Sequence, residues 1–111
     1  MNNKDRIILK KVLNEINIIE ALIDGFYLEI FISDERTKRA VCMTLINIGE
    51  LVKNLNDELR MQNKDIPWRE ISGMRDIAAH KYQTLKIERV WNTAKKDIPN
   101  FKEHILSILN Q

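Results

Sequence analysis

The stretch that decides the fold is AVCMTLINIGEL, residues 40–51. Its apolar residues recur in steps of three and four, which places them on one stripe of an α-helix and predicts burial of that stripe against other helices. The same spacing continues outward at Val41, Leu45, Ile48, Val52, Leu55 and Leu59. An upstream segment shows it too, at Ile8, Val12, Ile16, Ile19, Ile23, Phe26 and Ile30. The sequence therefore predicts two long amphipathic helices.

Polar residues and prolines indicate where the predicted helices begin. Asp5 is a candidate N-cap for the first long helix, and Ser33 and Asp34 offer cap oxygens for the second. Pro67 suits a first helical position, because the N–H that proline lacks would be unpaired there anyway. We expect residues 67–73 to form a short helical turn before a longer helix begins.

The rest of the chain completes an all-helical pattern. An amphipathic segment begins near Ile87 and a last helix begins at Pro99, while no segment alternates for long with the period of a strand. The chain has 111 residues with only three glycines and two prolines, so long helices are expected. We predict one domain over residues 1–111, an all-α antiparallel bundle of four to five helices.

Composition narrows the classes of function. Lysine and arginine outnumber the acidic residues by 18 to 16, and a formal charge of +2 is too small to indicate a nucleic-acid binder by itself. The single cysteine, Cys42, excludes an internal disulfide and a multi-thiolate metal site, and it is expected in the core. The N-terminus lacks the pattern of a signal peptide and no apolar run could cross a bilayer, so we expect a cytoplasmic protein with no membrane partner.

The stretch MRDIAAHKY, residues 74–82, carries the candidate chemistry. Arg75 suits an anionic phosphate, His80 suits proton transfer near neutral pH, and Tyr82 offers a hydroxyl. Solvated or capping roles on a helix are the ordinary alternatives for these residues. On a regular helix positions 75 and 80 point roughly 140° apart. For both to meet one phosphate, either the helix ends or distorts near His80, or a two-fold axis brings two chains together.

Three segments of the sequence together resemble a known family. IPWREISGMRDIAAHKY (66–82), IERVW (87–91) and the upstream INIGEL (46–51) together resemble the HepT-like branch of the HEPN superfamily, over nearly the whole chain. The hallmark R-x-x-x-x-H-x-Y is matched by Arg75, His80 and Tyr82. Two positions depart from the pattern. Asp76 stands where the family more often has asparagine, and Lys86 stands where many relatives have aspartate.

The resemblance implies a helical-bundle homodimer that acts as a metal-independent ribonuclease without a cofactor. Many such proteins are toxins paired with a minimal nucleotidyltransferase antitoxin. It further implies that Arg75 and His80 are catalytic and that Tyr82 is the residue to which the antitoxin attaches AMP. Glu50, in the IGE segment, is expected to orient Arg75 across the bundle or to be a solvated carboxylate. Asp76 is a supporting candidate that could weaken the attraction of Arg75 for phosphate.

The implied chemistry agrees with the residue types. RNA carries its own nucleophile, the 2′-hydroxyl, so neither a bound metal ion nor an activated serine is required. Two alternatives stay open at this level. One is a non-catalytic HEPN module that binds nucleotide or RNA for a partner nucleotidyltransferase, and the other is a helical dimerisation protein. Cleavage of RNA without added metal distinguishes the enzyme from both.

Overall fold

The computed structural model describes residues 1–81 and 87–111, and the side chains of residues 1–76 and 87–111. In chain order the elements are α1 (Asn3–Leu22), α2 (Leu28–Ser33), α3 (Glu35–Lys53), α4 (Asp57–Gln62), α5 (Trp68–Lys81), α6 (Ile87–Asn92), the π-helical turn η2 (Thr93–Asp97) and α7 (Ile98–Leu109). No described residue forms a strand. The all-α prediction is confirmed.

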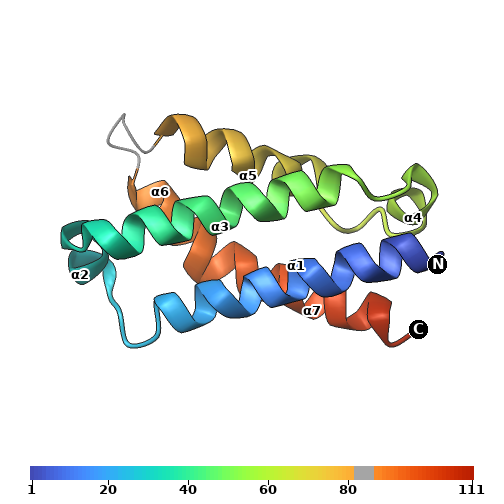
Figure 1. The fold of residues 1–111 in the computed structure, drawn as a ribbon, viewed down its shortest axis with the longest axis horizontal. Coiled ribbons are helices and arrows are strands. Elements are labelled where there is room, and N and C mark those ends of the chain that lie inside the picture. The colour runs from blue at the N-terminus through green and yellow to red at the C-terminus, as the bar shows by residue number, and fades with distance from the viewer. Residues whose placement is uncertain (82–86) are drawn as a thin grey trace.

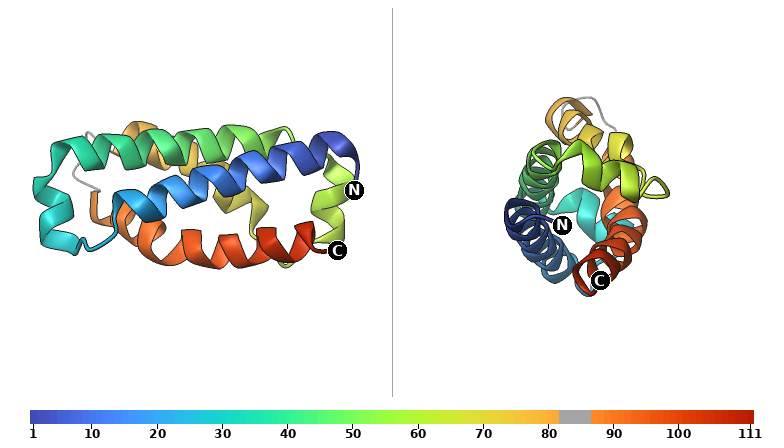
Figure 2. Two further views of the ribbon diagram at one scale, coloured as in Figure 1. Left: turned by 60° about the horizontal axis from the view of Figure 1, so that its bottom comes forward. Right: turned by 90° about the vertical axis from the view of Figure 1, so that its right-hand side faces the viewer.

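The four long helices run along the long axis of the molecule, with consecutive members in opposite directions (Figure 1). Helix α3 packs against α1 on one side and against α5 on the other, and α7 packs against α1. Figure 2 shows the bundle end-on, with α1 and α3 on one side and α7 on the other. The predicted apolar stripes meet in its core, where Val12, Leu45, Ile48, Val90 and Ile105 are fully buried.

Of the two predicted helix caps, one is confirmed and one is wrong. Asp34 caps α3 as predicted, because its Oδ1 accepts a hydrogen bond of 2.9 Å from the Thr37 N–H. The prediction for Asp5 is wrong. Asn2 caps α1 by accepting from the Asp5 N–H at 2.7 Å, while the buried Asp5 carboxylate accepts from the Asn56 N–H at 3.1 Å. Asp5 therefore ties the start of α1 to the residue preceding α4.

Both long apolar stripes extend beyond the helices that carry them. The first is interrupted at Gly25, whose φ of +76° favours glycine, so Ile30 belongs to the separate helix α2. The second ends at Lys53, and Leu59 lies on α4. Leu59 is still buried, because the chain turns after Asn54 and returns the apolar residue to the core. Apolar spacing predicted burial correctly except at Phe26 and Ile30, which are half-buried, and it predicted helix length incorrectly.

Helix α5 is longer at its start than the sequence indicated. The expected short turn at residues 67–73 is part of one continuous helix that begins at Trp68 and passes through Gly73 to Lys81. The indole N–H of Trp68 donates to the Asn63 carbonyl at 3.0 Å, which anchors the beginning of α5 to the preceding loop. This extension matters because α5 carries the candidate site.

Three further predictions concern the cysteine, membrane spans and the connection after Tyr82. Cys42 is buried in the core as expected, and burial raises the pKa of its thiol to about 11. In the described part of the chain, none of the helices combines the length and apolar character that a bilayer span requires. The expected connection at residues 83–86 lies outside the described residues.

Candidate active site

The candidate site lies where α3 and α5 pack closely together, at Gly49. Gly49 on α3 faces the backbone of α5, and a Cβ added to it would lie 3.0 Å from the Ser72 carbonyl oxygen, 3.0 Å from the Arg75 Cβ and 3.1 Å from the Arg75 nitrogen. Such distances are below ordinary van der Waals contact, so a larger residue would require α5 to move. Because Gly49 has no side chain, α5 can lie close enough for Arg75 to contact α3.

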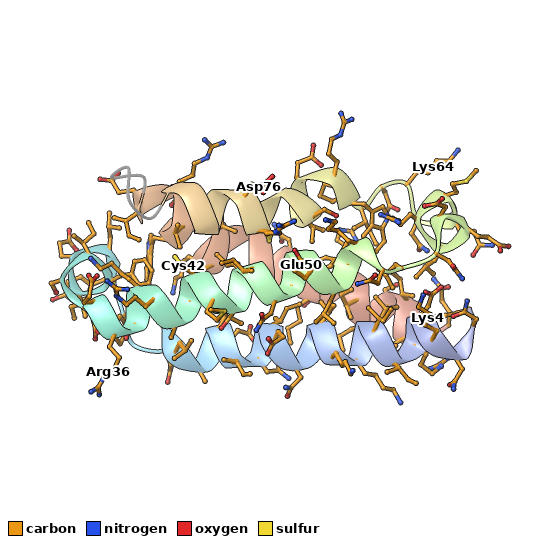
Figure 3. The ribbon with its side chains drawn as sticks, turned by 45° about the horizontal axis from the view of Figure 1, so that its top comes forward. Lys4, Arg36, Cys42, Glu50, Lys64 and Asp76 are labelled. Carbon is orange, nitrogen blue, oxygen red and sulfur yellow. The ribbon has the colours of Figure 1, made fainter. Side chains whose placement is uncertain are left out.

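The next residue on α3 contacts the arginine directly. The Arg75 Nε lies 2.7 Å from the Glu50 Oε1, and the two side chains are 45% and 48% exposed. Figure 3 shows Glu50 in the space between α3 and α5. The predicted contact between Glu50 and Arg75 across the bundle is thus present, and the role of Glu50 in catalysis stays a prediction.

The ion pair leaves most of the guanidinium available. Arginine has five N–H donors, and among the described residues the only ionic partner of Arg75 is the Glu50 carboxylate at Nε. The four N–H groups at its terminal nitrogens form the planar fork that suits a phosphate. A cation that is oriented on one side and open to solvent on the other can hold the non-bridging oxygens of a phosphodiester.

Of the other predicted site residues, the structure describes Asp76 in full and His80 only in its backbone. Asp76 is exposed on α5, away from Glu50, and forms no ion pair with Arg75 (Figure 3). The backbone of His80 belongs to α5, but its side chain lies outside the described set, and Tyr82 and Lys86 lie outside the described residues altogether. Among the described side chains, no three histidines, cysteines or carboxylates gather closely enough to share a metal ion.

Sequence reasoning identified Arg75 and Glu50 and missed the role of Gly49. A signal was available, since a glycine in the middle of a predicted buried helix costs helix stability and usually has a packing reason. What the pattern did not indicate is which helix comes close to it. That information comes only from the packing of α3 against α5.

Two glycine substitutions test this close approach with opposite expectations. Both Gly49→Ala and Gly73→Ala gain the helix propensity of alanine, about 1 kcal/mol. The added methyl group of Gly73→Ala meets no atom within 4 Å, whereas that of Gly49→Ala presses on the α5 backbone. We expect the Gly49 variant to be less stable than the Gly73 variant by about 1–3 kcal/mol in urea denaturation followed by circular dichroism. Equal stabilities of the two variants would show that α5 can move away from the added methyl group without loss of stability.

The comparisons with known proteins identify the family of this chain. The family model described as "Ribonuclease HepT-like" matches residues 12–108. The chain is 35% identical over 103 residues to a protein of Caldanaerobacter subterraneus subsp. tengcongensis named "Putative RNase", covering 93% of this chain and 92% of that one. It is 35% identical over 94 residues to the "Probable ribonuclease HepT" of Thermococcus cleftensis, covering 85% and 86% respectively.

A third relative is larger than this chain. The whole chain aligns at 36% identity with half of a Methanocaldococcus jannaschii protein named "Gamma-glutamylcyclotransferase and putative RNase". No solved structure matches the chain significantly.

Proposed function

Because this chain belongs to the Ribonuclease HepT-like family, we propose that it is a metal-independent endoribonuclease in which Arg75 and His80 are catalytic. The observation that carries the proposal is the Arg75 guanidinium, which Glu50 holds at 2.7 Å on one side and which solvent reaches on the other. In this proposal Glu50 is a positioning residue. Asp76 is a weaker candidate, because it is exposed without an ion pair to Arg75.

The proposed reaction uses the nucleophile of the substrate itself. The 2′-oxygen attacks the adjacent phosphorus, the bond from phosphorus to the 5′-oxygen breaks, and the products end in a 2′,3′-cyclic phosphate and a 5′-hydroxyl. The 2′-hydroxyl loses its proton to a base and the departing 5′-oxygen gains one. His80 acts as general base or general acid in these transfers. Arg75 stabilises the added negative charge on the non-bridging oxygens in the transition state.

We further propose that the protein is the toxin of a toxin–antitoxin pair whose antitoxin is a minimal nucleotidyltransferase. The support is the match to the R-x-x-x-x-H-x-Y pattern at Arg75, His80 and Tyr82, together with the family. The tyrosine is the part of that pattern that the cleavage chemistry leaves unused. An acceptor hydroxyl seven residues beyond the phosphate-binding arginine in the sequence suits control by a nucleotide.

Incubation of RNA with the purified protein in EDTA tests the activity. We expect cleavage to continue, with products that carry 2′,3′-cyclic phosphate and 5′-hydroxyl ends. Loss of cleavage in EDTA that Mg²⁺ restores would overturn the metal-independent mechanism. Binding of RNA without cleavage under any condition would favour the non-catalytic binding module.

We propose that the active unit is a symmetric homodimer with the two Arg75–His80 segments beside a shared cleft. Both positions lie in α5, so a regular helix separates them by roughly 140° about its axis. Two chains related by a two-fold axis bring an arginine of one and a histidine of the other to the same cleft. Met43, 58% exposed on the face of α3 that carries Glu50, is the apolar contact expected in that interface.

The dimer is tested by light scattering at micromolar concentration, where we expect twice the chain mass of 13.1 kDa. Met43→Glu places a charge in the proposed interface and is expected to yield monomers that have lost cleavage. Met61→Glu is the matched control, because Met61 is 65% exposed on α4 and is expected to tolerate the charge. A fully active monomer would contradict the shared cleft.

A further inference from the structure

A groove of about 730 Å³ lies between α1 and α3 and adjoins the Glu50–Arg75 ion pair. Its walls are formed by Ile7, Lys10, Lys11, Asn14 and Glu15 of α1 and by Asn47, Glu50, Leu51 and Asn54 of α3. Glu50 belongs to both features, because it lines the groove and also contacts the Arg75 guanidinium. The groove therefore opens next to the proposed phosphate site.

The charges of the groove favour an anionic occupant. Lys10 and Lys11 are exposed, and neither has a carboxylate within ion-pair distance among the described residues. Of the two carboxylates in the groove, the charge of Glu50 is balanced by Arg75, whereas Glu15 keeps its negative charge. Glu50 pairs with the arginine, and Glu15 accepts a hydrogen bond of 2.7 Å from the Asn47 side-chain amide. The two lysines therefore outnumber the one carboxylate of the groove, Glu15, whose charge no cation balances among the described residues.

The other lining groups fit a single strand of nucleic acid. Asn14 is an exposed amide that can donate to and accept from sugar hydroxyls and base edges. Asn54 is exposed too, and because one of its amide N–H groups already donates to the Glu50 carbonyl at 3.0 Å, its other N–H and its oxygen remain for RNA. Ile7, which is 47% exposed, and Leu51 give apolar surface against which a base can lie. Lys4 lies one heptad before Lys11 on the same face of α1 and extends the positive charge beyond the groove.

We propose that this α1–α3 groove binds the single-stranded RNA that flanks the scissile phosphate, with Lys10 and Lys11 contacting backbone phosphates. The proposal rests on the ribonuclease function proposed above and adds the path of the substrate. A strand seated in the groove reaches Arg75 past Glu50, so binding in the groove aligns one phosphodiester with the guanidinium.

Fluorescence anisotropy with a short, labelled 2′-O-methyl RNA tests the groove without cleavage, since this probe lacks the nucleophile. Each phosphate contact to a single strand contributes about 0.7 to the slope of log affinity against log salt. Lys10→Ala/Lys11→Ala is therefore expected to reduce the slope by about 1.4. At 0.1 M salt it is expected to weaken binding on the order of tenfold.

Two controls make the result specific. Lys95→Ala/Lys96→Ala removes an adjacent lysine pair from η2, which lies on the other side of the bundle from α1 and α3 (Figure 2), and is expected to leave affinity and slope unchanged. Lys10→Arg/Lys11→Arg keeps the charge and is expected to keep the affinity. Circular dichroism and light scattering of each variant confirm helix content and mass.

Three results would overturn the proposal. The first is an unchanged slope and affinity in Lys10→Ala/Lys11→Ala. The second is an equal loss in the arginine variant, which would mean that the lysines act through packing. The third is loss of the dimer in the alanine variant, which would assign the groove to contact between copies. Cleavage by the wild-type protein is measured separately, so failure of the ribonuclease function leaves the binding result interpretable.

Discussion

RNA cleavage is expected to fall by about 10²- to 10⁴-fold when His80 is replaced by alanine, because the reaction then loses its general acid–base group. Arg75→Ala is expected to have an effect of similar size. It removes the cation that stabilises the additional negative charge on the phosphate in the transition state. Rates are measured in EDTA on one RNA substrate, under single-turnover conditions, for both variants and for the wild-type protein.

The chain offers a matched control for each substitution. His104→Ala removes the other histidine of the chain, on α7, and Arg69→Ala removes an exposed arginine from the same helix as Arg75. Both controls are expected to cleave within a few-fold of wild type. Arg75→Ala and Arg69→Ala should keep their helix content, because both arginines are exposed. Circular dichroism checks the helix content of the two histidine variants. Wild-type activity in His80→Ala would reject its catalytic role.

Complete silencing is expected when a cognate nucleotidyltransferase and ATP act on Tyr82. This tyrosine follows Arg75 by seven residues in the sequence. Transfer joins the phenolic oxygen to the α-phosphorus of ATP, releases pyrophosphate, and gives up the phenolic proton. The attached AMP adds bulk and a negative phosphate that competes with RNA for the Arg75 guanidinium. We propose one or more AMP units at this residue.

Intact-mass and peptide mass spectrometry, followed by the cleavage assay, measure the modification and its effect. Tyr82→Phe is the control that lacks the acceptor oxygen, and Tyr27→Phe is the matched change at the other tyrosine, which is exposed before α2. We expect adducts on wild type and on Tyr27→Phe only. Adducts that persist undiminished in Tyr82→Phe would show that another residue is the acceptor.

The sequence predicted the parts of the fold that depend on local chemistry. The apolar stripes are buried as their spacing indicated, except at the half-buried Phe26 and Ile30, and Asp34 caps α3. The helix ends at Leu22 and Lys53 were missed, because the apolar spacing persists through the turns that follow them. The cap at Asp5 was misplaced because its carboxylate is used by Asn56, which is 51 residues away in the chain.

The candidate site likewise has residues that the sequence predicted and features that it did not. Arg75 and Glu50 were found because their motifs are local, and the contact between them follows from α3 packing on α5. The close approach at Gly49 and the lysines of the α1–α3 groove depend on which helices lie side by side. Periodicity identifies buried faces but does not determine which faces meet.

The central claim is that the 2′-hydroxyl of the substrate is the nucleophile and that Arg75 and His80 act on the phosphodiester next to it. An RNA with one preferred cleavage position, compared with the same RNA carrying 2′-deoxyribose at only that nucleotide, tests this most directly. The account predicts that cleavage at that position disappears while cleavage elsewhere continues. Undiminished cleavage at the deoxyribose would mean that water attacks the phosphorus, and would contradict the account.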